Sequence, residues 1–256
     1  MRDLLQIRPE ADDVSIGARA ARRIPQPLMR YIAFALPRVP RRILSARIDW
    51  SGTFLTRPRG RPMPFTAHQS ILISPPQFVW DADMRMFPGV HVRVRDSYAN
   101  GRGVTHARVG FLSMVNQSGT PRTGEAALQR FLGEAIWFPT ALLPTSGVAW
   151  QSVNDRRATA TLSDSGHRAT IDFHFGDRGE IVGASALRYR DVGDRSILTP
   201  WQTRSWDYEP IDGFMIPRRA EAEWLLPDGP LTYWRGTVEQ VSYTYETGPS
   251  IHVGER

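Results

Sequence analysis

Hydrophobic and polar residues alternate with a period of two over most of the chain. The clearest stretch is residues 90–95, in which valines alternate with histidine and arginines. One apolar face with this period is typical of a half-buried antiparallel strand. Similar alternation occurs in residues 158–162 and 169–175, and short turn sequences such as Asn100-Gly101 separate these stretches. We predict roughly ten to twelve strands joined by short turns, which favours an antiparallel meander.

One long segment has a helical period instead. Its apolar residues fall at i, i+3, i+4, i+7 and i+8, which makes one stripe along a helix. These residues are Leu128, Phe131, Leu132, Ala135 and Ile136. Pro121 suits the first helical turn, and Pro139 ends the helix because the residue before a proline disfavours the α conformation. The pattern predicts one long helix over residues 121–138, with Trp137 about 180° from Leu128 and off the stripe.

The N-terminal part of the chain differs from the rest. Residues 1–46 are predicted to form a basic arm with a short amphipathic helix that ends before Pro37, and residues 47–256 to form a single domain. In that helix Leu28 and Ile32 share the apolar face, whereas Tyr31 is placed off it. Two interpretations stay open, a helix folded against the domain and a helix lying on a membrane surface.

These elements predict an α+β fold that is mainly β. An antiparallel sheet of this size curls, so we expect a half-barrel wrapped on the helix at 121–138, with the short helix near the N-terminus. One helix is too narrow to fill a wide half-barrel. The concave side is therefore either filled by aromatic side chains or hollow enough to hold a ligand, and the eight tryptophans of the chain suit both alternatives.

Six residues are candidates for ligand binding in such a cavity. Tryptophans would form its apolar wall, and glutamates on the helix would anchor polar groups. The candidates are Trp80, Glu125, Glu134, Trp137, Trp150 and Trp224. Each glutamate also has an ordinary explanation. Glu125 is favoured in the first turn by the helix dipole, and Glu134 follows Arg130 at the spacing of a surface ion pair.

The distribution of charge adds a second functional hypothesis. Residues 17–61 contain eleven Arg and one Asp, whereas the net charge of the whole chain is only +6. Such a basic segment suits a membrane surface, nucleic acid, or the more acidic body of the same protein. No nucleic-acid motif accompanies it, so nucleic acid is the least favoured partner.

Targeting signals and cysteine chemistry are not apparent in the sequence. No apolar signal segment is visible at the N-terminus, and the longest apolar run near it, residues 31–37, is too short to span a bilayer. We therefore expect a cytoplasmic protein. The absence of Cys excludes disulfides, thiolate metal sites and a Cys nucleophile.

No motif specifies a reaction, a cofactor or a metal, and catalytic residues cannot be named. The six histidines lack metal-binding spacing, which leaves only an assembly across strands, such as His91 with His106. An enzyme that uses a buried carboxylate as acid or base stays open. Its candidates are Glu125, Glu134, Asp81, Asp83, Asp172 beside His174, Glu221 and Glu223. We expect the three strand pairs among them to lie on solvated faces.

Several motifs resemble an uncharacterised family of prokaryotic proteins with a domain of unknown function. They include IPQPLMRYIAFAL, PPQFVWDADM, GEAALQRFLGEAIWFPTALLP and DGFMIPRRAEAEWLLPDG, of which WFPTALLP is the most specific. The resemblance covers about residues 25–245 and implies no established activity. The layout is similar to lipoprotein-carrier folds, in which a half-barrel over a helix accepts acyl chains. It implies a bacterial protein that binds an apolar or lipid-like small molecule, although no signal sequence or lipoprotein Cys accompanies it.

Overall fold

The computed structural model describes residues 24–110, 112–192 and 195–247. In this part of the chain, thirteen strands form one antiparallel sheet, accompanied by two α-helices and three 3-10 turns. The helical elements are α2 (Gln26–Ala35), α3 (Pro121–Glu134), η1 (Ala135–Trp137), η2 (Pro139–Leu142) and η3 (Pro144–Ser146). The strands are β1 (Ile43–Phe54), β2 (Met63–Leu72), β3 (Gln77–Phe87), β4 (Val90–Ala99), β5 (Arg102–Val109), β6 (Leu112–Ser118), β7 (Ala149–Asn154), β8 (Arg157–Asp164), β9 (His167–Phe175), β10 (Ile181–Val192), β11 (Arg195–Ile211), β12 (Phe214–Leu226) and β13 (Gly229–Tyr245).

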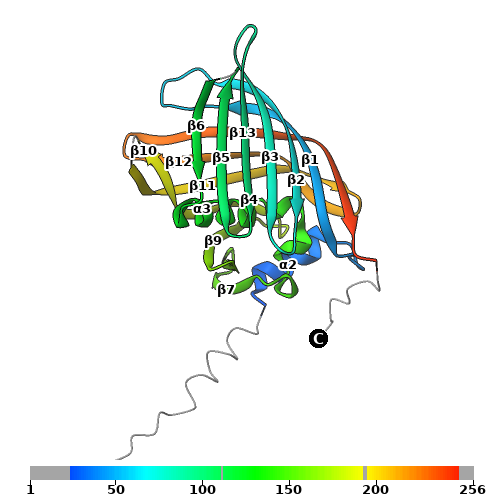
Figure 1. The fold of residues 1–256 in the computed structure, drawn as a ribbon. Helices are drawn as coiled ribbons and strands as arrows, with labels where there is room; N and C mark the ends of the chain where they lie inside the picture. Colours follow the sequence, from blue (N-terminus) through cyan, green and yellow to red (C-terminus); the bar gives the residue numbers. More distant parts are fainter. Residues whose placement is uncertain (1–23, 111, 193–194, 248–256) are drawn as a thin grey trace, which may run out of the picture.

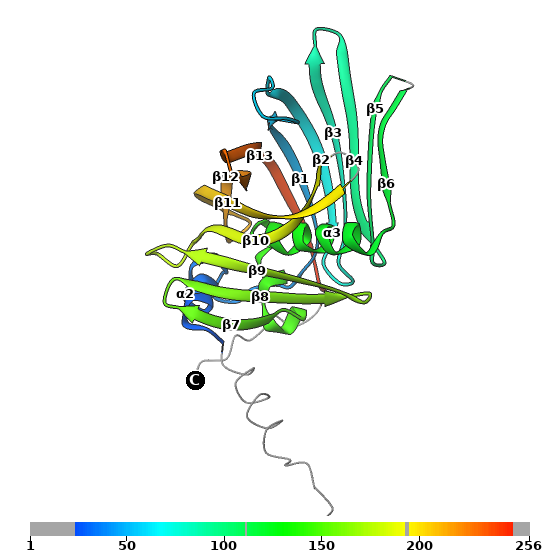
Figure 2. The same cartoon turned by 90° about the vertical axis from the view of Figure 1, so that its left-hand side faces the viewer.

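The sheet is open and strongly curved. Its order is β6-β5-β4-β3-β2-β1-β13-β12-β11-β10-β9-β8-β7, so that β1 pairs with β13 and the two edges are β6 and β7 (Figures 1 and 2). The predicted fold class, a mainly β half-barrel with one long helix and a short N-terminal helix, is confirmed. The strands are more numerous than predicted partly because Gly110, at φ +55°, divides the expected strand at 104–115 into β5 and β6.

Helix α3 lies between the two wings of the sheet, against β4 and β5 on one side and β8, β9 and β10 on the other (Figure 2). Thr120 caps its first turn by accepting a hydrogen bond from the backbone N–H of Thr123. The α-helix ends at Glu134, earlier than the predicted Phe138, and continues as the 3-10 turn η1. This tighter winding and the burial of both sides of the helix bring Trp137 into the interior.

The helix approaches one wing closely because glycines lie at the contact. A Cβ added at Gly103 would come within 2.2 Å of the Thr123 carbonyl oxygen, and one at Gly124 within 2.5 Å of the Gly101 carbonyl oxygen. Across the gap between the wings, the Tyr98 hydroxyl donates to Asp164 at 2.6 Å. The wings are therefore joined through both the helix and a direct hydrogen bond.

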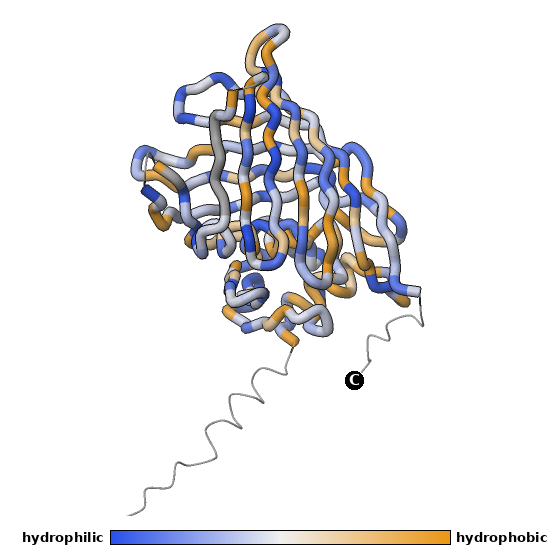
Figure 3. Tube along the Cα trace, in the orientation of Figure 1, coloured by the Kyte–Doolittle hydropathy of each residue, from blue (hydrophilic) through white to orange (hydrophobic). Residues whose placement is uncertain are grey.

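The main hydrophobic core lies where α2 and the 3-10 turns meet the lower ends of the strands, where hydrophobic positions gather in Figure 3. Leu28, Tyr31 and Ala35 of α2 are fully buried, so the interpretation of a helix folded against the domain is confirmed. Placing Tyr31 off the apolar face was wrong. It lies three residues after Leu28 and four before Ala35, which is the spacing of one helical face.

The basic N-terminal segment is only partly described. Residues 1–23 of the predicted arm lie outside the described residues. Seven residues of the Arg-rich 17–61 segment are among them. Further along, α2 packs against β12 and β8, and β1 begins at Ile43 in the middle of the sheet. The part of the arm that the structure describes is thus continuous with the body of the protein.

Candidate functional site

A cavity of about 220 Å³ lies beside helix α3, on the concave side of the sheet. Aromatic side chains from five elements form its wall. They are Phe54, Trp80, Trp137, Trp201, Tyr233 and Trp234. Ligand pockets in proteins usually measure about 300–1,000 Å³ and have mainly apolar walls with a few polar groups. This cavity has such a wall and suits a small molecule, or one end of a longer chain.

Part of the aromatic wall depends on an irregularity in β13. Ala222 of β12 pairs with Trp234, but the next residue, Glu223, pairs with Thr232, so Tyr233 is an additional residue in β13. This bulge allows the consecutive Tyr233 and Trp234 side chains both to line the cavity, although regular alternation would place them on opposite faces.

The floor of the concave side is closed by aromatic packing. Trp50 contacts Trp137 and Trp234 edge-on, with ring centroids 4.8 and 5.5 Å apart, and Phe65 contacts Trp80 at 5.7 Å. The Trp137 indole N–H donates to the Pro217 carbonyl oxygen at 2.9 Å. Both alternatives for the concave side therefore hold in part, because aromatic residues fill its floor and a cavity persists above them.

A chain of polar contacts crosses one side of the cavity. Arg130 of α3 donates from Nε to Glu134 at 2.7 Å and from Nη1 to Asp96 of β4 at 2.8 Å. Glu134 also accepts from the Gln69 amide at 2.6 Å, and Gln69 in turn accepts from the Trp50 indole at 2.9 Å. Although burial opposes it, the charges of Glu134 and Asp96 together raise the pKa of Arg130. Arg130 is therefore firmly charged and already paired.

A second arginine faces the cavity from β10. Arg188 lies over the Trp201 ring, with Cζ 4.5 Å from the centroid, and its Nη2 donates to the Ala126 carbonyl oxygen at 2.8 Å. Within the described residues no carboxylate forms an ion pair with Arg188, and its Nε has no hydrogen-bond partner. Burial lowers the pKa of this guanidinium and the nearby Arg130 adds to the effect, whereas Tyr233 and the charge of Glu134 oppose it in part. An arginine nevertheless stays protonated in proteins.

Three of the six predicted binding residues line this cavity, namely Trp80, Glu134 and Trp137. Glu134 does pair with Arg130, but its side chain is only 19% exposed, so the expected surface pair is instead an interior one. The reason is that sheet wings cover both sides of α3.

The other three candidates lie elsewhere. Trp150 is buried against Phe173 and donates its indole N–H to the Leu142 carbonyl oxygen. Trp224 stacks on Tyr233, outside the cavity lining. Glu125 is partly exposed and does not line the cavity. Placing it in the first turn was wrong, because α3 begins at Pro121 and has no acidic residue in its first turn. Ligand binding by these residues stays a prediction.

The strand carboxylates do not form a catalytic pair. The expectation of a solvated face was wrong for Glu221 and Glu223, which are 7% and 4% exposed. Glu221 lines the cavity, where it pairs with Arg204 and with Arg235. Glu223 accepts from Thr232.

Asp172 and His174 have separate partners. Asp172 accepts from Thr159, whereas His174 Nε2 hydrogen-bonds the Ser185 hydroxyl at 2.9 Å. Burial and the nearby Arg157 lower the pKa of His174. Each side chain thus has a structural role in the sheet.

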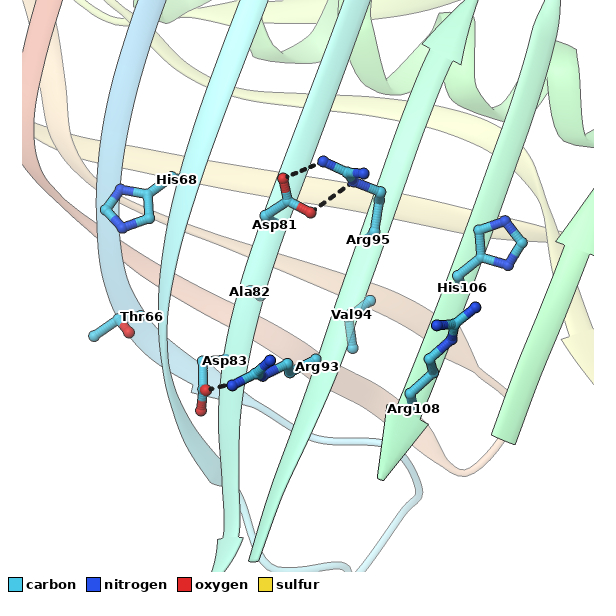
Figure 4. A pocket seen from close by; sticks show the side chains of 10 residues that line it. All are labelled: Thr66, His68, Asp81, Ala82, Asp83, Arg93, Val94, Arg95, His106 and Arg108. Carbon is cyan, nitrogen blue, oxygen red and sulfur yellow. Dashed lines mark hydrogen bonds and ion pairs between the residues drawn. The ribbon is translucent and has the colours of Figure 1, made fainter. Parts of the chain in front are cut away.

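A wider depression of about 510 Å³ lies over β2–β5, on the other side of the sheet (Figure 4). Its two carboxylates, Asp81 and Asp83, are both paired. Arg95 donates to both carboxylate oxygens of Asp81, at 2.7 and 2.9 Å, and His91 contacts Asp83. Without an aromatic wall and with its carboxylates paired, this depression is the weaker candidate for a binding site.

No candidate metal site and no membrane-spanning helix occurs in the described part of the chain. It contains no group of three or more His, Asp or Glu residues arranged to hold a metal ion. His91 and His106 do not face each other across β4 and β5, because His106 pairs with Arg95. None of the described helices has the length and apolar character needed to cross a bilayer.

Sequence reasoning named Glu134 and Glu221 but missed the other polar residues in and around the cavity. Arg130 was considered only as a surface partner of Glu134, and Asp96, Gln69 and Arg188 were not singled out. Arg188 falls in the sequence ALRYRDV, where arginines alternate with other residues as on any exposed strand. No local signal distinguishes it, since its position over Trp201 depends on the pairing of β10 with β11.

A family model described as a family of unknown function (DUF6920) matches residues 22–243. The chain belongs to this family. The resemblance to an uncharacterised family is thereby confirmed, and no curated protein matches the sequence.

The chain is also similar to several solved structures. A DUF1329 family protein from Desulfovibrio piger has 10% identity over 78% of this chain and 86% of that chain, with a TM-score of 0.43. A LolA superfamily protein from Nitrosomonas europaea has 12% identity over 84% and 90%, with a TM-score of 0.36. A β-barrel-like protein of the DUF1849 family from Brucella abortus has 10% identity over 80% and 99%, with a TM-score of 0.28.

Proposed function

We propose that the protein binds an apolar or amphipathic small molecule, such as a lipid or fatty acyl chain, in the cavity beside α3. The observation that carries this proposal is the cavity itself, a space of about 220 Å³ with six aromatic side chains in its wall. Leaving such a wall in contact with water is unfavourable, at about 25 cal/mol per Å² of apolar surface. An apolar guest removes this cost, whereas a solid core would have no space for one.

The polar groups of the cavity support an amphipathic guest over a purely apolar one. Arg130, Glu134 and Asp96 form one connected network on the α3 side. The Arg188 guanidinium lies over the Trp201 ring. A few fixed polar groups within an apolar wall orient a ligand and make binding selective.

Binding can be tested with a neutral dye whose fluorescence rises in apolar surroundings, such as N-phenyl-1-naphthylamine. We expect saturable one-site binding to the full chain, and competition by medium-length fatty acids. The Gly133→Leu variant places a side chain in the cavity wall between Ile171 and Trp201, and should weaken dye binding on the order of tenfold, about 1.4 kcal/mol. Native mass spectrometry of protein purified from cells should show a bound small molecule.

Two controls make the test decisive. The Ala149→Leu variant adds the same side chain at an exposed position of β7 and should bind the dye as the unmodified protein does. Circular dichroism must show that both variants fold. A protein that neither binds the dye nor carries a ligand would contradict the proposal, as would equal dye binding by the folded Gly133→Leu variant.

Binding to an anionic surface through the Arg-rich segment has less support. The apolar face of α2 is buried in the protein and is not available to a membrane. Arg41 lies over the Tyr245 ring, with Cζ 3.7 Å from the centroid, and 3.9 Å from Asp212. Part of the basic segment is therefore in contact with the body of the same protein.

A further inference from the structure

Three arginines line the cavity, and they differ in their partners. Arg204 pairs with Glu221 of β12. Arg130 holds both nearby carboxylates, Glu134 at 2.7 Å and Asp96 at 2.8 Å. The partners of Arg188 that the structure places nearby are neutral, namely the Ala126 carbonyl oxygen, the Trp201 ring and the Tyr233 hydroxyl. Since burying a charge is unfavourable unless an opposite charge accompanies it, Arg188 is the group whose environment a ligand can complete.

The surroundings of Arg188 are suited to an anionic group. The Trp201 ring covers one face of the guanidinium, which keeps its orientation fixed, and the Trp201 indole N–H donates to the Tyr233 hydroxyl at 3.0 Å. The Tyr233 hydroxyl is thus held within the cavity and has its own proton free to donate. A planar guanidinium beside a hydroxyl donor matches the oxygen atoms of a carboxylate or a phosphate.

The negative charges in the cavity do not oppose such a ligand strongly. Three carboxylates line the cavity, and each is bound to an arginine other than Arg188. Glu134 and Asp96 are bound to Arg130 of α3, and Glu221 is bound to Arg204 and Arg235. The aromatic wall joins the two sides and can cover the apolar part of a ligand. An amphipathic molecule can therefore place its charged end at Arg188 while its chain lies against the tryptophans.

We propose that the ligand carries an anionic head group, a carboxylate or a phosphate ester on an apolar chain, and that Arg188 with Tyr233 binds this group. The inference rests on the proposed function, because it assigns the charged end of the molecule that the cavity holds. An anionic head group would make binding selective for charge, which apolar binding alone does not require.

Competition with the neutral dye tests the inference near neutral pH. Decanoate, decyl phosphate, decanol and inorganic phosphate are the competitors. The two amphipathic anions should displace the dye at concentrations on the order of tenfold lower than decanol does. Inorganic phosphate should not displace it, since it has no chain to contact the aromatic wall. Displacement by phosphate as strong as that by decyl phosphate would contradict the proposed amphipathic ligand.

Variants assign the selectivity to Arg188. Arg188→Gln should bring decanoate down to the affinity of decanol while decanol binding stays within about twofold. Arg188→Lys keeps the positive charge and should retain most of the preference. The control is Arg93→Gln, at a side chain that is 84% exposed on β4, and it should keep the full preference.

The outcomes separate the inference from the proposed function. If decanol and decanoate displace the dye equally well from the unmodified protein, the anionic head group is wrong and apolar binding stands. If the preference persists in Arg188→Gln, another group binds the anion. If no competitor and no dye binds, the proposed function fails. Should Arg188→Gln not fold, Tyr233→Phe removes the proposed hydroxyl donor and should lower the preference for decanoate over decanol, whereas an unchanged preference would contradict the assigned site.

Discussion

At the scale of single residues, Arg130 connects helix and sheet. It lies on α3, and its two carboxylate partners come from the same helix and from β4, 34 residues earlier in the chain. The three side chains are 19–26% exposed, so water screens the charges only in part. Removing one member leaves the others uncompensated in a partly buried site, which is the costly case for an ion pair.

We therefore expect Arg130→Met to lower the free energy of unfolding by about 3 kcal/mol, because Glu134 and Asp96 lose their shared cation. Urea denaturation followed by circular dichroism measures this change. Arg156→Met is the matched control, since the Arg156–Asp177 pair is exposed and should contribute less than about 1 kcal/mol. Equal effects of the two substitutions would show that the interior network contributes little to stability.

At the scale of elements, the position of α3 depends on glycines as much as on its apolar stripe. Gly124 faces the hairpin between β4 and β5, with no room for a side chain, whereas a Cβ at Gly133 would meet only Ile171 at 3.4 Å and Trp201 at 3.7 Å. The 3.7 Å distance to Trp201 is an ordinary van der Waals contact. Gly124 thus has no space for a side chain, whereas Gly133 of the same helix has space for one.

Alanine substitutions should separate these two roles. Gly124→Ala is expected to destabilise the protein by about 1–3 kcal/mol, because the methyl group overlaps the Gly101 carbonyl and the His167 ring. Gly133→Ala should stabilise it by about 0.5–1 kcal/mol through the better helix propensity of alanine. Thermal and urea denaturation of both variants provide the measurement. A gain in stability for Gly124→Ala would mean that the helix does not approach the hairpin this closely.

At the scale of the whole molecule, the short N-terminal helix belongs to the body. Leu28 and Tyr31 of α2 are fully buried, and Tyr31 contacts Phe175 of β9 edge-on, with ring centroids 6.3 Å apart. Its burial raises the pKa of the Tyr31 hydroxyl. Such contacts between α2 and the sheet favour a single cooperative unit over a body with a detachable arm.

Leu28→Ala should accordingly cost about 2–5 kcal/mol of unfolding free energy, the range for a buried leucine that leaves a cavity. Met29→Ala, next to it but 51% exposed, should change stability by less than about 0.5 kcal/mol. Both values come from equilibrium denaturation. If Leu28→Ala unfolded at the same denaturant concentration as the unmodified protein, α2 would not be part of the cooperative unit in solution.

The fold class was predictable because it depends on the pattern of hydrophobic residues within short stretches of the sequence. The alternation in 90–95 and 169–175 determines strands, and the spacing of Leu128 and Leu132 determines a helix, whatever the rest of the molecule does. A large antiparallel sheet and one long helix then leave few arrangements, so the half-barrel followed.

Only the tertiary structure decided which residues line the cavity. Gln69 meets Glu134 across 65 residues of chain, Arg188 reaches Trp201 through the pairing of β10 with β11, and a single bulge brings Tyr233 and Trp234 to one face. Register, bulges and curvature are properties of the assembled sheet. They leave no period in the sequence, because each depends on contacts between segments that local patterns cannot relate.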